Sequence, residues 1–340
     1  MAKPVLIPLA FSLLVSFILL PMANRFEKWG INRVLSAILV IFGIILLLSG
    51  GIFLFSTQII NLSSKVSDFQ DKILQVLTKA TLFFNRNISF LPSIEEGDLI
   101  NRLKSWFSES AGVLVSKTFN NTASFIGGFV SVIVFTFLLL IYRSSLAHAF
   151  SCFFPLNKRE NALQMFKKVQ LVGKKYLLGM LILMIILGTV NSIGLLIIGI
   201  DNPFLFGFLA GILAIVPYIG TLIGAAIPIL YAFLIYDSVW MPIAVIILFW
   251  GVQSVESNYL SPKIVGKSLN VNALTVILSI IIGASVWGIA GMILFLPFTA
   301  MFKTVCEQYE ELKPMALLIG EHNNKVKHSD GDFLKNMMIK

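Results

Sequence analysis

The stretch from residue 176 to residue 262 contains no lysine, arginine or histidine. Its only charged residues are acidic: Asp201, Asp237 and Glu256. The stretch is several times longer than the roughly 20 residues that one membrane helix needs, and it is too apolar for a soluble domain. It therefore predicts several membrane-embedded segments. A carboxylate in such a segment is costly unless it caps a helix, pairs with a cation or has a function.

The composition of the whole chain supports an integral membrane protein. Of the 340 residues, 57% are hydrophobic and 13% are charged, whereas a soluble domain is about 25% charged. The net charge of +9 does not indicate nucleic-acid binding, because the basic residues cluster in loops beside apolar spans. Such clusters orient a membrane protein in the lipid bilayer.

Few residues are suited to metal or nucleotide chemistry. The two cysteines, Cys152 and Cys306, match no metal-ligand or redox spacing. The chain has three histidines and no phosphate-binding loop of the GxxxxGK[ST] type. We therefore expect no metal, no cofactor and no enzymatic activity.

Alternation of apolar and polar segments predicts an all-α, polytopic transmembrane protein. The two basic loops, 23–33 and 143–175, are expected in the cytoplasm because positive residues favour that side. The expected parts are a transmembrane pair (1–56), an extracytoplasmic amphipathic helical hairpin (57–122), a transmembrane helix (123–142), basic interfacial helices (143–175), a transmembrane core (176–303) and a flexible cytoplasmic tail (304–340).

The extracytoplasmic part contains a heptad-like apolar seam between residues 59 and 83. Its apolar residues recur in steps of three and four, as they do on one face of a helix. The seam suits a helical hairpin packed on itself or on the membrane surface. It equally suits contact between protomers of a homo-oligomer. The seam residues are Ile59, Leu62, Val66, Phe69, Ile73, Val76, Ala80 and Phe83.

Two apolar blocks, 203–236 and 273–302, are too long for one straight span and short for two. Each has glycine and an aromatic residue near its middle, and Tyr218 precedes Pro228 by the same spacing as Trp287 precedes Pro297. This pattern predicts two re-entrant or broken helical hairpins, arranged as an inverted repeat. Such interrupted segments are typical of transporter binding sites. The alternative is ordinary helix pairs joined by Gly/Pro turns.

Three segments of the chain carry a resemblance to a known family. They are G-I-D-N-P-x3-G-x3-G-x5-P-Y-I-G (199–220), Q-x2-E-x5-P-K-I-V-G-K-S-L (253–269) and G-x4-G-x2-G (283–291) followed by Pro297. Together they resemble the autoinducer-2 exporter (AI-2E) family of bacterial membrane proteins. Family members usually begin with a further apolar span, so seven spans or hairpin units are expected here where the family is often drawn with eight.

The resemblance implies a multi-pass transporter of the bacterial cytoplasmic (inner) membrane. Members are linked to export of autoinducer-2, and others to sodium/proton antiport. The first hypothesis is therefore export of a small polar solute or signal by alternating access. A Na⁺(K⁺)/H⁺ antiporter is the second hypothesis. The third is an oligomeric membrane scaffold or channel without coupled transport.

Glu256 is the residue expected to bind a proton or cation; the alternative is an interfacial ion pair with Lys263. Asp201-Asn202-Pro203 is expected to start a helix with a capping side chain, or to present backbone N–H groups to a polar substrate. Asp237 is expected to be solvated. The predicted substrate or ion pathway comprises Asp201, Asn202, Pro203, Pro217, Tyr218, Gly220, Gln253, Glu256, Asn258, Pro262, Lys263, Gly266, Trp287, Gly288, Gly291 and Pro297.

Overall fold

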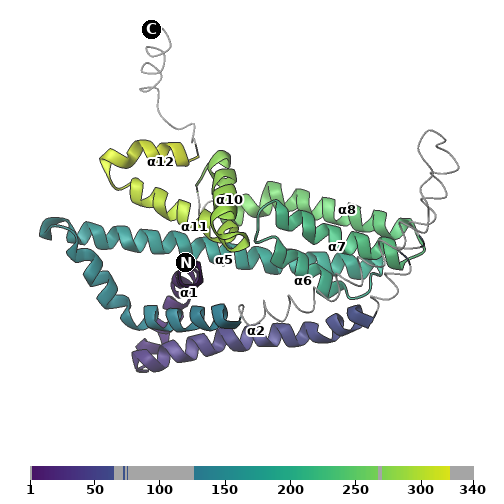
Figure 1. Ribbon diagram of the computed structural model, residues 1–340, viewed down its shortest axis with the longest axis horizontal. Helices are drawn as coiled ribbons and strands as arrows, with labels where there is room; N and C mark the ends of the chain where they lie inside the picture. Colours follow the sequence, from purple (N-terminus) through teal and green to yellow (C-terminus); the bar gives the residue numbers. More distant parts are fainter. Residues whose placement is uncertain (1, 65–71, 73–74, 76–125, 267–269, 322–340) are drawn as a thin grey trace, which may run out of the picture. The chain divides into compact units, whose positions relative to one another are not determined.

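A computed structural model describes residues 2–64, 72, 75, 126–266 and 270–321 (Figure 1). Within these residues the only β-structure is an isolated bridge between Val271 and Gly320. Six of the described helices are long and apolar enough to cross a membrane. The predicted all-α, polytopic class is therefore confirmed. Most of the predicted seam at 59–83 lies outside the described residues.

The helices follow one another with short connections. Two 3₁₀ turns, Leu156–Lys158 and Glu310–Leu312, and two π-helical segments, Glu256–Leu260 and Pro262–Gly266, lie between them. The helices are α1 (Lys3–Lys28), α2 (Arg33–Ser64), an unlabelled helix Ile126–Cys152, α5 (Arg159–Ile198), α6 (Pro203–Leu213), α7 (Ile219–Ile235), α8 (Trp240–Val255), α10 (Ala273–Trp287), α11 (Ile289–Cys306) and α12 (Lys313–Ile319).

The described chain forms two compact units. Unit 1 contains the described residues up to Ser144 together with Leu177–Ile264. Unit 2 contains Ser145–Tyr176 together with the described residues from Val265 onward. Helix α5 passes from one unit to the other without a break, so the expected interfacial segment after Arg159 and the expected span 177–200 belong to one helix of 40 residues.

One part of unit 1 is formed by α1, α2 and residues 126–144 of the helix Ile126–Cys152. Their buried side chains form a small core that includes Leu19, Val40 and Leu140. At one end, Arg143 is paired with Glu27, and Arg33 Nη1 donates to the carbonyl oxygen of Ile141 at 3.1 Å. These contacts bring loop 23–33 and residue 143 to the same end of the helix group, as a common cytoplasmic location requires.

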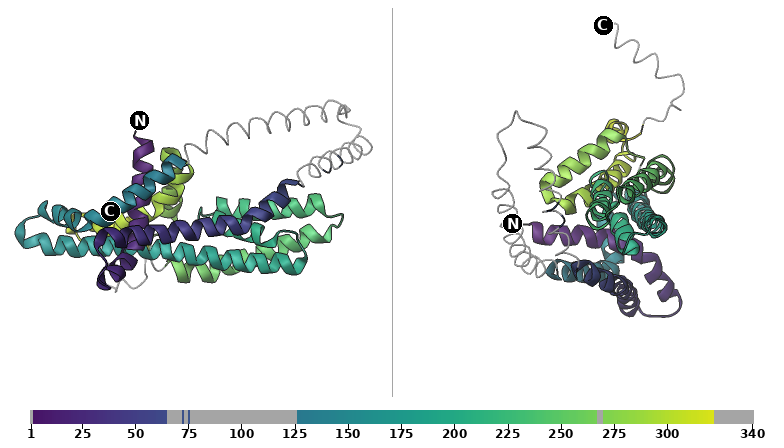
Figure 2. Two further views of the ribbon diagram at one scale, coloured as in Figure 1. Left: turned by 90° about the horizontal axis from the view of Figure 1, so that it is seen from below. Right: turned by 90° about the vertical axis from the view of Figure 1, so that its right-hand side faces the viewer.

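The other part of unit 1 contains the C-terminal half of α5 with α6, α7 and α8. Leu195, Phe206, Tyr231, Val245 and Phe249 are among the buried residues of its core. Helix α2 runs alongside this group (Figure 2), and its Phe55 ring lies 5.6 Å from the ring of Phe208, centroid to centroid. Unit 1 therefore places the predicted hairpin 203–236 against a long membrane-spanning helix.

Both predicted interruptions of the apolar blocks are present. The first block is broken between α6 and α7, where Tyr218 has a φ of 64°. The second is broken between α10 and α11 at Gly288, with a φ of 62°. Only glycine adopts positive φ values readily, which explains Gly288 at the second break. Tyr218 adopts a positive φ against the preference of its side chain.

The end of the described chain is folded, which corrects the expectation of a flexible tail for residues 304–321. Helix α12 is followed by a return to the start of α10 within unit 2. The Asn272 side chain donates to the carbonyl oxygens of Leu318 at 2.6 Å and Gly320 at 3.1 Å. Its Oδ1 also accepts the N–H of Thr275 at 2.8 Å and so caps α10. Polar composition alone did not reveal these contacts.

Candidate substrate and ion site

Glu256 lies where α8 changes into a π-helix. Regular α-helix ends at Val255, and the segments Glu256–Leu260 and Pro262–Gly266 follow with π-helical bonding. A π-helix has a wider turn than an α-helix and is found mostly as short stretches at functional sites. The second family-like motif therefore coincides with the irregular part of a candidate membrane span, Trp240–Gly266.

Neutral side chains surround the carboxylate of Glu256, a residue that is only 8% exposed. Gln253 Nε2 donates to Oε2 at 2.6 Å, and Ser257 Oγ donates to the same oxygen at 3.3 Å. Ser261 Oγ donates to the other carboxylate oxygen, Oε1. Among the described residues no cation lies within ion-pair distance, so the alternative pairing with Lys263 is wrong.

The neutral partners of Glu256 can hydrogen-bond to either form of a carboxyl group. Serine hydroxyls can donate to a carboxylate or accept from a carboxylic acid. Ser257 and Ser261 can therefore serve both forms by rotation of their hydroxyl groups. A fixed cation would instead favour the ionised form. The same hydroxyl oxygens, with the carboxylate, are also suitable ligands for a monovalent cation.

Helix lengths place Glu256 within its span, toward the end away from Trp240. Helix α8 has 16 residues before it, which is about 24 Å at the helical rise, and a bilayer core is about 30 Å thick. Helix α7 is 17 residues long and packs against α8, so Tyr218 lies about 25 Å from the far end of α7. Because consecutive helices α7 and α8 share the connection at 236–239, Glu256 and Tyr218 lie at similar depth.

At the other end of α6 and α7, the expected start at Pro203 is confirmed, but the expected capping side chain is wrong. Asn202 occupies the N-cap position with φ 54° and ψ 46°, and its side chain makes no capping hydrogen bond. A capping residue normally has an extended backbone that directs its side chain to the helix. Here Gln58 of α2 takes this role: its Oε1 accepts the N–H of Leu205 at 2.9 Å.

Asp201 is part of a hydrogen-bonded connection between the two ends of the α6–α7 pair. Tyr231 donates its hydroxyl to Asp201 Oδ2 at 3.3 Å. The Asp201 N–H donates to the Tyr236 hydroxyl at 2.8 Å, and that hydroxyl donates to the carbonyl oxygen of Gly199 at 3.2 Å. These bonds hold the entry to α6 beside the exit from α7.

The solvated position expected for Asp237 is found. Its side chain is 95% exposed, and it pairs with Lys72 Nζ at 2.8 Å. Lys72 Nζ also donates to the carbonyl oxygen of Ile235 at 3.0 Å, at the C-terminus of α7. A cation there interacts favourably with the helix dipole. Gln58 and Lys72 thus contact the first turn of α6 and the last turn of α7, the two neighbouring ends of the same broken hairpin.

The turn between α6 and α7 explains why particular residue types occur in the P-Y-I-G motif (217–220). A Cβ on Gly220 would lie 1.7 Å from the carbonyl oxygen of Leu213, so only glycine fits. Pro217 precedes the positive-φ residue Tyr218, whose side chain is 65% exposed. The motif therefore builds a tight helix break that presents an aromatic side chain.

In unit 2, the corresponding motif also produces close packing. A Cβ on Gly291 would lie 1.9 Å from the carbonyl oxygen of Gly283, so the two helices meet through glycine backbone. The Trp287 ring lies 5.8 Å from the Phe295 ring, edge to face. Pro297 is buried within α11. These residues shape the α10–α11 pair.

The predicted pathway residues are brought together only in part. Gln253 and Glu256 are in contact, whereas Asn258 is exposed and donates to the Ser254 carbonyl oxygen at 2.7 Å. Pro262 and Lys263 are exposed in the second π-helical segment, and Gly266, also exposed, belongs to unit 2. Asp201 and Tyr218 lie at opposite ends of α6.

Sequence reasoning missed several polar residues. Ser257 and Ser261 were overlooked although they flank Glu256 in an otherwise apolar span. Asn191, the one amide in the predicted span 177–200, was a usable signal; it is 4% exposed. Lys303 is 6% exposed and pairs with Glu307 at 2.9 Å in unit 2. Within the described residues, no cluster of acidic, histidine or cysteine side chains could hold a metal ion.

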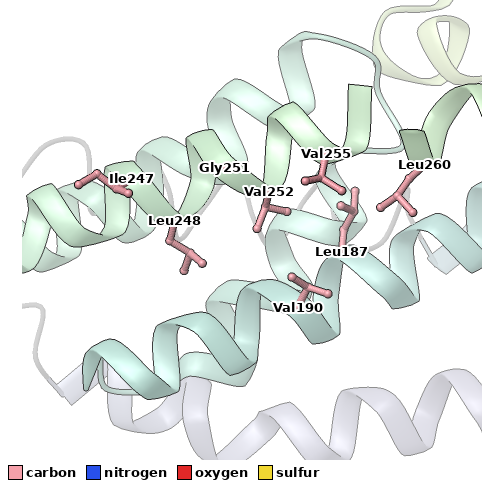
Figure 3. Close-up of a pocket in the computed structure, with 8 residues that line it drawn as sticks. All are labelled: Leu187, Val190, Ile247, Leu248, Gly251, Val252, Val255 and Leu260. Carbon is pink, nitrogen blue, oxygen red and sulfur yellow. The ribbon is translucent and has the colours of Figure 1, made fainter. Parts of the chain in front are cut away.

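A pocket of about 360 Å³ lies between α5 and α8, entirely within unit 1 (Figure 3). All of its lining residues are apolar, and most of the labelled side chains point into the space between the two helices. It reaches the level of the first π-helical turn. The lining residues are Leu187, Val190, Ile247, Leu248, Gly251, Val252, Val255 and Leu260.

A family model described as "AI-2E family transporter" matches residues 1–311. "Putative transport protein YueF" of Bacillus subtilis (strain 168) is 36% identical over 44% of this chain and 40% of its own length. A "Putative transport protein" of Thermotoga maritima is 26% identical over 62% of this chain and 64% of its own length. "AI-2 transport protein TqsA" of Escherichia coli (strain K12) is 30% identical over 42% and 41%, respectively. Each match spans less than two thirds of the relative's length.

Proposed function

This chain belongs to the AI-2E family of transporters, and from that membership we propose that it exports a small polar solute or signal molecule by alternating access. We place it as a multi-pass protein in the bacterial cytoplasmic membrane, which suits its six candidate spans. The relative named as an AI-2 transport protein makes AI-2 one candidate cargo.

The observation that supports coupled transport is the buried Glu256 carboxylate. It lies in a candidate membrane span and is held by Gln253, Ser257 and Ser261 rather than by a cation. An ionisable group in such a place is expensive and is typically retained for function. We assign to Glu256 the binding of the coupling proton.

The α6–α7 pair is proposed as a re-entrant hairpin that forms one wall of the pathway. Helix α6 has 11 residues, or about 16 Å, which is about half of the bilayer core. Its start and the end of α7 are joined by the tyrosine contacts to Asp201 and Gly199. A hairpin with both ends on one side brings the Tyr218 turn inside the bilayer core, where irregular backbone must line a cavity or be buried.

The test is a flux screen with purified protein in proteoliposomes. Vesicles loaded with AI-2 or with small metabolites are given an inward or outward proton gradient. The export hypothesis predicts that solute movement accelerates several-fold when the proton gradient has the correct sign. Solute movement equal to that of protein-free vesicles, across the whole panel, contradicts export.

A second candidate is exchange of a monovalent cation for protons. The oxygen atoms around Glu256 favour it, since carboxylate and hydroxyl oxygens are hard ligands suited to such ions. In vesicles with a pH-sensitive dye and a preset proton gradient, addition of Na⁺ or K⁺ then collapses the gradient. An unchanged dye signal over a wide pH range excludes this candidate.

A further inference from the structure

The turn between α1 and α2 lies close to a surface of the membrane. Both helices are candidate membrane spans, and only residues 29–32 connect them. Such a short connection reaches at most about 14 Å when fully extended, so it cannot carry the chain far from the bilayer. The pair of Glu27 with Arg143 lies at this end of unit 1, which we expect in the cytoplasm. The side chains that the turn exposes therefore face lipid headgroups or the water beside them.

Arg25 and Lys28, in the last turn of α1, are cations without a partner in the described protein. Both are exposed, and among the described residues neither side chain makes an ion pair or a hydrogen bond. The one carboxylate in the loop 23–33 is that of Glu27, and it is already paired with Arg143. Two positive charges therefore remain available to an anion outside the protein.

Trp29 adds an exposed aromatic ring to the same turn. It is 73% exposed, and its ring lies 5.5 Å from the Phe26 ring, edge to face. Tryptophan is enriched at the level of the lipid headgroups, because its ring is apolar while its indole N–H can donate to a polar group. The position of Trp29 beside two free cations therefore suits contact with a lipid rather than with water alone.

The spacing on α1 brings these groups onto one face of the helix. Met22, Arg25 and Trp29 follow one another in steps of three and four, so they lie above each other on the helix surface. All three are exposed, whereas Leu19 and Ala23 face the core of this helix group and are buried. Along the helix the face offers an apolar side chain, a cation and an aromatic ring. This order matches the acyl chain and the headgroup of a phospholipid.

We propose that this turn is a binding site for an anionic phospholipid of the phosphatidylglycerol type. Arg25 and Lys28 bind its phosphate, Trp29 lies at the boundary between headgroup and acyl chains, and an acyl chain lies along Met22. Cations near an anionic membrane surface each strengthen binding several-fold. A zwitterionic lipid brings its own ammonium group to the two cations and is therefore held less firmly. Orientation of the chain by its basic residues requires no bound lipid, so this site is a separate property of the turn.

Trp29 itself reports whether the lipid is bound. The full-length protein is reconstituted in vesicles of phosphatidylethanolamine that contain a minor share of phosphatidylglycerol brominated in its acyl chains near the headgroup. Bromine quenches tryptophan fluorescence on contact, and the Trp29 signal is the difference between the unaltered protein and Trp29→Phe. We expect brominated phosphatidylglycerol to quench this signal about three- to tenfold more strongly than the same share of brominated phosphatidylethanolamine.

Two matched double variants test the role of the cations. Arg25→Gln combined with Lys28→Gln should lower the preference for phosphatidylglycerol about threefold or more. Lys158→Gln combined with Lys167→Gln removes the same charge from exposed lysines of unit 2 and should leave the preference unchanged. The comparison of the two lipids in the unaltered protein remains decisive if the first double variant does not insert into the membrane.

Three results overturn the proposal. Equal quenching of Trp29 by the two brominated lipids shows that the turn contacts the membrane without selecting a lipid. An unchanged preference after replacement of Arg25 and Lys28 removes these cations from the site. An equal loss of preference in both double variants shows that the net charge of the protein, rather than this turn, attracts anionic lipid. None of these readouts involves flux, so failure of this proposal and failure of the transport proposal are distinguishable.

Discussion

Residues 176–262, the stretch without lysine, arginine or histidine, contain three carboxylates with different surroundings. Asp237 is exposed and paired with Lys72, and Asp201 accepts a tyrosine hydroxyl near the start of α6. Glu256 is buried and held by neutral groups. The surroundings, rather than the residue type, therefore make Glu256 the candidate for coupling.

At the scale of single residues, we predict that Ser261→Ala weakens coupled flux about two- to tenfold, because the Glu256 carboxylate loses one hydrogen bond. Ser261→Thr keeps the hydroxyl and should restore most of the rate. Ser254→Ala is the matched control, since among the described residues its hydroxyl bonds only the Trp250 carbonyl oxygen of its own helix. Initial rates in proteoliposomes measure the effect, and equal rates for Ser261→Ala and Ser254→Ala would contradict it.

Glycines determine how closely the helices of unit 1 approach. Helix α6 lies against α5 at Gly211, where a Cβ would be 2.6 Å from the Met184 carbonyl oxygen and 2.9 Å from the Gly188 nitrogen. Small residues at such contacts let backbones come together, as is usual between membrane helices. The position of the α6–α7 hairpin on α5 therefore depends on these glycines.

The corresponding prediction compares two glycines in helices of unit 1. Gly211→Ala should destabilise the protein by about 1–3 kcal/mol, because the methyl group would meet backbone atoms and force the helices apart. Gly251→Ala meets nothing within 4 Å and should be neutral or stabilising by up to about 1 kcal/mol. Thermal unfolding in detergent, followed by tryptophan fluorescence, distinguishes them. A midpoint for Gly211→Ala at or above that of Gly251→Ala would be inconsistent with this packing.

At the scale of the whole molecule, the expected orientation of the chain in the membrane follows from the residues at the two ends of unit 1. Glu27, Arg33 and Arg143 meet at one end, whereas Asp237 and Lys72 meet beyond the end of α7. Basic clusters favour the cytoplasmic side. We therefore expect Lys263, about one span after Asp237, on the cytoplasmic side.

This orientation predicts opposite labelling of two single-cysteine variants made after Cys152 and Cys306 are replaced by alanine. Asp237→Cys should react with an impermeant maleimide on intact cells. Lys263→Cys should react only after permeabilisation. Reaction of both from the same side would refute the orientation. Cross-linking of cysteines placed within 59–83 tests the predicted homo-oligomer separately.

Sequence reasoning predicted the helical class and both helix breaks because long apolar runs, Gly and Pro are local signals. It also selected Glu256 as a candidate, since a lone carboxylate in an apolar span is conspicuous. The N-terminal cap of α6 escaped prediction because Gln58, its capping residue, is 147 residues away in the chain. The Asn272 contacts with Leu318 and Gly320 were missed for the same reason. Contacts between distant residues leave no local pattern.

The most direct test of the account compares Glu256→Gln with Asp237→Asn. Each variant replaces one carboxylate by an isosteric amide in unit 1, and the two carboxylates differ in burial. Both proteins are purified, shown to be folded and reconstituted at equal density, and gradient-driven flux is measured. The account predicts that Glu256→Gln reduces coupled flux to the level of protein-free vesicles, whereas Asp237→Asn retains at least half of the unaltered rate. Unaltered coupled flux in Glu256→Gln would contradict the central claim.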